Sequence, residues 1–148
     1  RPGYELLIDQ SINKARYFAD LIKQQSDFEL VSEPELCLLT YRYVPESVKA
    51  ALLKADAKER IELNELLNEL TKFIQKKQRE TGRSFVSRTR LNPEVWAHQP
   101  IIVFRVVLAN PLTGNDILSS VLEEQREIST LAPNLMGKIT KLVTQINT

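Results

Sequence analysis

An apolar run covering residues 100–111 has no polar face when it is read as a β-strand. Alternation places the even-numbered residues from Ile102 to Leu108 on one side and the odd-numbered residues from Ile101 to Ala109 on the other. A strand that is apolar on both sides is normally covered on both sides. The pattern therefore predicts the central strand of a sheet, with Arg105 as its one charged residue.

Three longer segments repeat apolar residues at the spacing of one helix face. They cover residues 4–25, 57–81 and 117–128, and each predicts an amphipathic helix. Apolar residues at Ile139, Leu142, Val143 and Ile146 predict one more short amphipathic helix within residues 134–148. Runs rich in β-branched and aromatic residues, at 28–31, 36–44 and 84–91, predict the remaining strands.

The order helix, two strands, helix, two strands, helix predicts an α+β fold. Because the strands follow one another as hairpins, we expect a four-stranded, mainly antiparallel sheet with three main helices on one face. The other face, which carries Val103, Arg105 and Val107, then needs a cover from outside this chain. The chain also begins without methionine, which suggests a segment of a longer protein.

Composition narrows the possible functions. The length of 148 residues fits one domain, and a net charge of +1 gives no electrostatic basis for binding nucleic acid or an anionic membrane. With one cysteine, one histidine and four isolated glycines, the chain has no metal-ligand motif, catalytic triad or phosphate-binding loop. We therefore expect no metal, no cofactor-binding residue and no catalytic residue in this chain, and a reducing, cytoplasmic setting.

Arg105 is the candidate binding residue. A guanidinium stays charged, and burying it is costly unless an anion meets it. The anion could be an internal Asp or Glu, or the position could be a solvated rim, and the pattern alone favours one of these ordinary explanations. The alternative is a carboxylate or phosphate on a ligand.

Several stretches taken together resemble the group II pyridoxal-phosphate-dependent amino-acid decarboxylases, over residues 4 to about 131. The chain is similar to their C-terminal domain. The stretches that carry the resemblance are residues 27–31, 33–35, 41–45, 85–91 and 104–113, the last leading into Glu123 and Glu124. The connection 92–100 and the tail from Pro133 match no pattern of the family.

The resemblance implies that residues 1–148 form a single C-terminal domain, with 1–26 bridging to an absent large domain, 27–132 as the α+β core and 133–148 as a variable tail. It implies a carboxy-lyase that uses pyridoxal 5'-phosphate bound by the absent domain and forms a homodimer at full length. It also implies that Arg105 anchors the substrate carboxylate. Among substrates it favours an acidic amino acid, aspartate or glutamate, with diaminobutyrate close behind. The chain alone should be inactive.

A function from another class remains open at this point. The chain could be a non-catalytic α+β binding or regulatory module in which Arg105 holds a small anionic effector. A nucleic-acid-binding domain is a third possibility, which the near-neutral charge disfavours.

Overall fold

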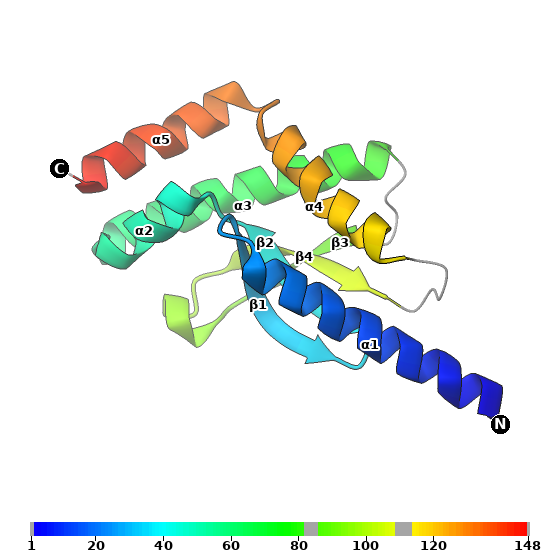
Figure 1. The fold of residues 1–148 in the computed structure, drawn as a ribbon. Coiled ribbons are helices and arrows are strands. Elements are labelled where there is room, and N and C mark those ends of the chain that lie inside the picture. Colours follow the sequence, from blue (N-terminus) through cyan, green and yellow to red (C-terminus); the bar gives the residue numbers. More distant parts are fainter. Residues whose placement is uncertain (1, 82–85, 109–113, 148) are drawn as a thin grey trace.

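The computed structural model describes residues 2–81, 86–108 and 114–147, and only the backbone of residues 2–9, 11 and 95. The helices and strands follow the predicted α+β order (Figure 1). Two further helices accompany the three main ones. The elements are α1 (Pro2–Gln24), β1 (Phe28–Glu35), β2 (Leu38–Tyr43), α2 (Glu46–Lys54), α3 (Ala57–Glu80), β3 (Val86–Leu91), the 3-10 turn η1 (Glu94–Trp96), β4 (Ile101–Val107), α4 (Asn115–Ser129) and α5 (Pro133–Asn147). No helix within the described residues is long and apolar enough to span a membrane.

The four strands form one antiparallel sheet in the order β1-β2-β4-β3. Strand β4 lies between β2 and β3, which confirms the prediction that the apolar run is an inner strand. Its register aligns Arg105 with Thr40 on β2 and with Ser87 on β3. The α+β class and the antiparallel sheet are both as predicted.

Strand β1 is longer than the sequence pattern indicated. The pattern predicted a strand over residues 28–31, but the strand continues through Pro34 to Glu35. The pairing with β2 shifts register between Leu30 and Ser32 and again between Ser32 and Glu35. Proline is tolerated on an edge strand or at a bulge because no ladder hydrogen bond depends on its nitrogen there, and Pro34 has both advantages.

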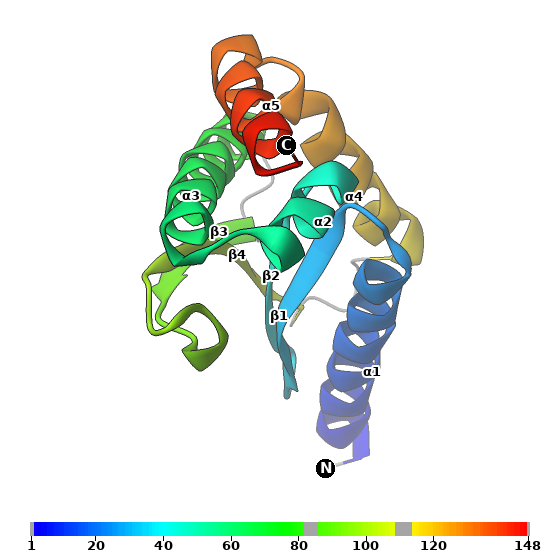
Figure 2. The same cartoon turned by 90° about the vertical axis from the view of Figure 1, so that its left-hand side faces the viewer.

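One face of the sheet packs against helices and holds the main core. Phe104 and Val106 are fully buried on this face, as the alternation along β4 predicted. Four aromatic rings meet here, with centroids 5.2–6.0 Å apart in the pairs that involve Tyr41; the rings are those of Phe18, Phe28, Tyr41 and Phe104. Helix α1 contacts β1 and β2, α3 contacts β4 and β3, and α4 contacts α1 and α3 (Figure 2).

A chain of buried polar groups crosses this core. The Tyr41 hydroxyl donates to Gln125 Oε1 at 3.0 Å, Gln125 donates to Gln78 Oε1 at 2.9 Å, and Gln78 donates to the carbonyl of Val121 at 3.3 Å. Burial raises the pKa of Tyr41 well above its usual range, and the hydrogen bond to Gln125 acts in the opposite direction. The chain joins β2, α4 and α3, so it fixes how these elements face one another.

An ion pair joins helix α4 to the residue just before strand β1. Arg126 on α4 donates to both carboxylate oxygens of Asp27, at 2.6 and 2.9 Å. Its guanidinium also lies 5.2 Å from the centroid of the Phe28 ring and pairs with Glu123. The hydrogen bond to Asp27 raises the pKa of Arg126, and the bidentate geometry fixes α4 against the start of β1.

Helices α2, α3 and α5 pack against one another. Helix α3 starts at a capping box, in which Asp56 accepts from the Glu59 backbone at 2.8 Å and Glu59 accepts in return at 3.1 Å. The end of the chain, predicted as one short helix, forms the 15-residue α5. Helix α5 packs on α2 and α3 through Ile139, Leu142 and Val143 (Figure 2).

Candidate functional site

Arg105 lies on the sheet face opposite the main core. Its backbone is paired on both sides, and the Ser87 hydroxyl donates to its carbonyl at 3.3 Å. The side chain is exposed, and no hydrogen bond or ion pair joins its guanidinium to another described residue. The internal Asp or Glu partner that the pattern favoured is therefore absent from the described part of the chain, and a solvated position is what the structure gives.

The surroundings of Arg105 are hydroxyl groups and aliphatic side chains. Thr40 lies beside it on β2 and shares a 2.6 Å hydrogen bond with Ser32 on β1, while Ser87 lies beside it on β3. Val107, two residues further along β4, keeps 41% of its surface exposed. A guanidinium with no acidic partner among the described residues is suited to binding a carboxylate, because its parallel N–H groups match the two carboxylate oxygens.

Only part of this face is open. We expected the whole side that carries Val103, Arg105 and Val107 to need a cover from outside the chain. Val103 is instead fully buried by the chain itself, and so is Ile101. The uncovered area is therefore restricted to the half of the face around Arg105 and Val107.

The buried arginine of this sheet is Arg42, which the sequence analysis did not single out. Its side chain has no exposed surface, and it donates to Glu29 at 3.1 Å and to Asn64 on α3 at 3.0 Å. Its guanidinium carbon lies 5.6 Å from the centroid of the Trp96 ring. Burial lowers the pKa of Arg42, and the Glu29 carboxylate offsets part of that shift.

The sequence held a weak signal for Arg42. It stands in a strand between Tyr41 and Tyr43, where an arginine between two aromatic neighbours indicates a partly buried site. Its acidic partner is Glu29, whose pairing with Arg42 follows only from the register of β1 on β2. Nothing in the local pattern separates Arg42 from Arg105.

The described residues do not form a site for pyridoxal phosphate. Such a site needs a lysine held out of water to form an imine with the cofactor, and every described lysine keeps part of its surface exposed. The described residues also contain no group of three His, Cys, Asp or Glu side chains placed to hold a metal ion. We therefore derive no chemical step through either group from this chain.

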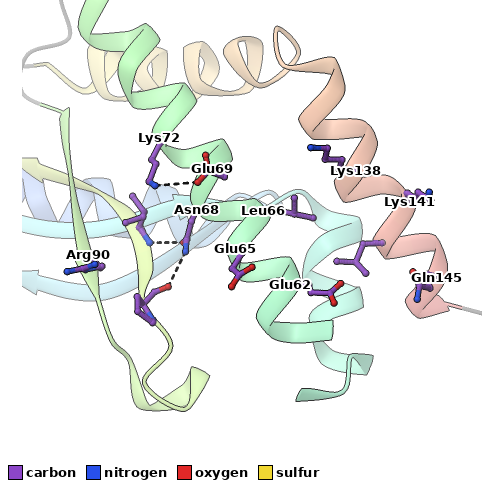
Figure 3. Close-up of a pocket in the computed structure, with 13 residues that line it drawn as sticks. Glu62, Glu65, Leu66, Asn68, Glu69, Lys72, Arg90, Lys138, Lys141 and Gln145 are labelled. Atoms are coloured by element: carbon purple, nitrogen blue, oxygen red, sulfur yellow. Dashed lines mark hydrogen bonds and ion pairs between the residues drawn. The ribbon is translucent and has the colours of Figure 1, made fainter. Parts of the chain in front are cut away.

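A cavity of about 700 Å³ lies between α3, α5 and the β3–β4 edge (Figure 3). Three glutamates line it from α3, and Lys138 and Lys141 line it from α5. Lys72 pairs with Glu69 at 3.3 Å, and the remaining charges are exposed. Mixed, exposed charges of this kind are typical of a solvated helix surface, so this cavity gives no functional assignment.

Comparison with known proteins places this geometry in a family context. No family model matches the chain. Over 146 residues, or 99% of its length, the chain is 65% identical to aspartate 1-decarboxylase of Aliivibrio fischeri, and it covers 27% of that protein. It is 27% identical to mouse cysteine sulfinic acid decarboxylase over 126 residues, covering 22% of it. The chain thus spans about a quarter of the length of these relatives.

Solved structures show the same fold. Mouse CSAD in its apo form matches 86% of the chain with a TM-score of 0.69 and 24% identity, and the match covers 24% of that protein. The glutamate decarboxylase domain of a diaminobutyrate enzyme from Vibrio parahaemolyticus matches 84% of the chain with a TM-score of 0.61 and 19% identity, covering 22% of its own chain. The resemblance to group II pyridoxal-phosphate-dependent decarboxylases is therefore confirmed, and this chain corresponds to one segment of such proteins.

Proposed function

We propose that this chain is the C-terminal domain of a pyridoxal-phosphate-dependent decarboxylase that acts on an acidic L-amino acid, aspartate before glutamate. The observation that carries the proposal is the 65% identity to aspartate 1-decarboxylase over nearly the whole chain. Because 146 of the 148 residues are aligned, the alignment includes β4 and nearly all of α5 as well.

In this proposal Arg105 binds the substrate carboxylate. A guanidinium that is exposed, unpaired among the described residues and held on an inner strand can offer two parallel N–H groups to a carboxylate. The backbone of β4 is bonded to strands on both sides, so the arginine starts from a rigid position. The hydroxyls of Thr40 and Ser87 stand beside it in register.

The remainder of the enzyme supplies the cofactor site. We expect an N-terminal large domain to bind pyridoxal phosphate on a lysine and to cover the open face around Arg105 and Val107. Helix α1 extends beyond the edge of the sheet towards the N-terminus (Figure 1), as expected if residues 1–26 bridge to that domain. We expect the full-length protein to be a homodimer, and the 148 residues alone to release no carbon dioxide.

The test uses the protein expressed from its natural start codon. Carbon dioxide release is measured with aspartate, glutamate, diaminobutyrate and cysteine sulfinate as competing substrates. We expect kcat/KM to be highest for aspartate, because the relative that is 65% identical to this chain is an aspartate 1-decarboxylase. Release from another of these substrates at a higher kcat/KM would correct the substrate.

A protein that binds no pyridoxal phosphate and decarboxylates none of the four would overturn the proposal. In that case binding of a small dicarboxylate to the same protein, lost in Arg105→Ala, would support the regulatory module instead. The absorbance of the bound cofactor distinguishes the two results before any rate is measured.

A further inference from the structure

The connection from β3 to β4 has an unusual backbone. After the turn η1, Ala97 and His98 both adopt left-handed conformations, with φ of 54° and 62°. Two successive non-glycine residues with positive φ are strained, and such strain persists only where the surroundings hold it. Here the amide of His98 donates to Pro93 at 3.0 Å, and Asn92 donates to the carbonyl of His98 at 3.0 Å.

Side-chain amides fasten this connection to α3. Asn64 donates to Gln99 at 3.1 Å, Gln99 donates to the carbonyl of Ile61 at 2.9 Å, and Asn68 donates to the carbonyl of Pro100 at 3.0 Å. The Trp96 ring is in turn contacted by the Arg42 guanidinium. The connection is thus a fixed wall facing the first turns of α3.

A cavity of about 640 Å³ lies between this wall and α3. Its volume falls in the range of about 300–1,000 Å³ that is usual for small-molecule sites. The Trp96 ring, Ile61 and Ala57 give it an apolar part, and Arg60, Glu65 and Glu94 give it charged groups. None of its lining residues belongs to the open face around Arg105.

Two donors in the cavity wall have no partner among the described residues. Trp96 Nε1 and Arg60 Nε are buried, and neither makes a hydrogen bond. Among the described residues the Arg60 guanidinium makes one hydrogen bond, from Nη2 to the carbonyl of Ala55 at 3.1 Å. Leaving a buried donor unsatisfied costs roughly 1–3 kcal/mol, so an acceptor that reached these donors would stabilise this wall.

The charges around the cavity define the chemistry of that acceptor. Glu65 and Glu94 line the cavity, yet neither pairs with Arg60. A simple anion would meet Arg60 but would be repelled by two carboxylates, and a simple cation would leave both donors unsatisfied. A small zwitterion satisfies all these groups, because it carries both a carboxylate and an ammonium group.

We propose that this cavity binds a short free amino acid. Its carboxylate accepts from Arg60 and Trp96, its ammonium group meets Glu65 or Glu94, and its carbon chain lies on the Trp96 ring. Slight opening of the wall is needed for contact, because the two donor nitrogens are covered in the structure. The proposal does not depend on the decarboxylase activity.

Trp96 makes the site directly observable, because it is the only tryptophan of the chain. The 148-residue protein, which has its own buried core, is titrated with glycine and with β-alanine while tryptophan fluorescence is recorded. Acetate and ethylamine, which carry one charged group each, are titrated in the same way. We expect saturable binding of at least one zwitterion, with acetate and ethylamine each at least about tenfold weaker.

Two variants locate the binding. Arg60→Gln should weaken zwitterion binding by about 10- to 150-fold, because a hydrogen bond from a charged donor is lost. Lys58→Gln is the control, since Lys58 is exposed on the same turn of α3 and does not line the cavity. Trp96→Phe, followed by ligand-observed NMR, should weaken binding by about 3- to 10-fold, because the indole donor is removed while an aromatic ring is kept beside Arg42.

Absence of saturable binding for both zwitterions would overturn the proposal. So would acetate binding as tightly as the zwitterions, or Arg60→Gln binding as tightly as the unmodified chain. If Arg60→Gln does not fold, as judged by circular dichroism, Trp96→Phe decides: unchanged affinity refutes the site, and weaker binding at undiminished stability supports it.

Discussion

Arg42 and Arg105 lie on neighbouring inner strands of the same sheet and have opposite environments. Arg42 is fully buried, with Glu29, Asn64 and Trp96 around its guanidinium. Arg105 is exposed, and no described residue pairs with it. A buried arginine that pairs with a carboxylate and an amide serves the stability of the fold, whereas an exposed one without a described partner, on a rigid strand, is available to a ligand. The two residues should therefore respond to substitution in opposite ways.

The largest effect on stability is expected at Arg42. Arg42→Ala removes one partner of a buried pair and leaves Asn64 without its donor, so the free energy of unfolding should fall by about 3 kcal/mol. This is the lower end of the usual range, because Glu29 keeps 30% of its side chain exposed and can be hydrated. Urea unfolding measures the change. Combining it with Glu29→Gln in a double-mutant cycle isolates the ion pair, and a cost below about 0.5 kcal/mol would contradict the structural role.

Arg105 should show the reverse pattern in the whole protein. Arg105→Ala should lower kcat/KM for the acidic substrate by roughly 30-fold to several thousand-fold, since losing one side of a charged pair costs about 2–5 kcal/mol. Arg105→Lys keeps the charge but loses the two-pronged geometry and should fall between. The free energy of unfolding should change by less than about 0.5 kcal/mol, because the side chain is exposed.

Arg90→Ala is the matched control for this comparison. Arg90 is exposed on the adjacent strand β3, and its register with Ile102 places it on the other face of the sheet. Arg90→Ala removes the same charge as Arg105→Ala, and it should leave kcat/KM unchanged. Loss of cofactor absorbance or of the fold in Arg105→Ala would argue that Arg105 is structural after all.

The smallest effect is expected at Tyr41. This residue compares a neutral polar group of the core with the charged Arg42. Tyr41→Phe removes the hydroxyl that donates to Gln125 and should cost about 1 kcal/mol near neutral pH. The folded-state pKa of Tyr41 is raised above its unfolded value, so its stabilising contribution is complete below about pH 10 and is lost as the pH rises above that value. Urea midpoints from pH 8 to 11 should therefore fall less steeply in Tyr41→Phe than in the unmodified chain; parallel curves would contradict this.

Much of the fold follows from periodicity. The apolar run through Phe104 could occupy only an inner strand, and the helix repeats placed α1, α3 and α4 within a few residues of their observed ends. These features depend on spacing within one segment. Pro34 shows the limit of prediction from one segment. It stays in β1 because the pairing with β2 shifts register twice, and these shifts depend on both strands.

The candidate site was less predictable, because exposure depends on elements far away in sequence. Arg105 was identified because it is the one charged residue of an apolar strand. Its exposure, however, depends on which other elements pack over each half of that sheet face. Arg42 depends on Glu29 and Asn64, which strand pairing and the docking of α3 bring together. Trp96 and His98 were given no role from sequence, because the cavity beside them exists only once α3 has docked.

The strand order also has a consequence for synthesis. Strands β1 and β2 can pair as soon as they leave the ribosome, but β3 has no neighbour in the sheet until β4 is made. For the interval between Val86 and Val107, the nascent chain carries the open edge of β2 and an unpaired β3 at once. Unpaired strand edges promote association between chains. Premature termination within β4 would therefore leave a product that cannot close its own sheet.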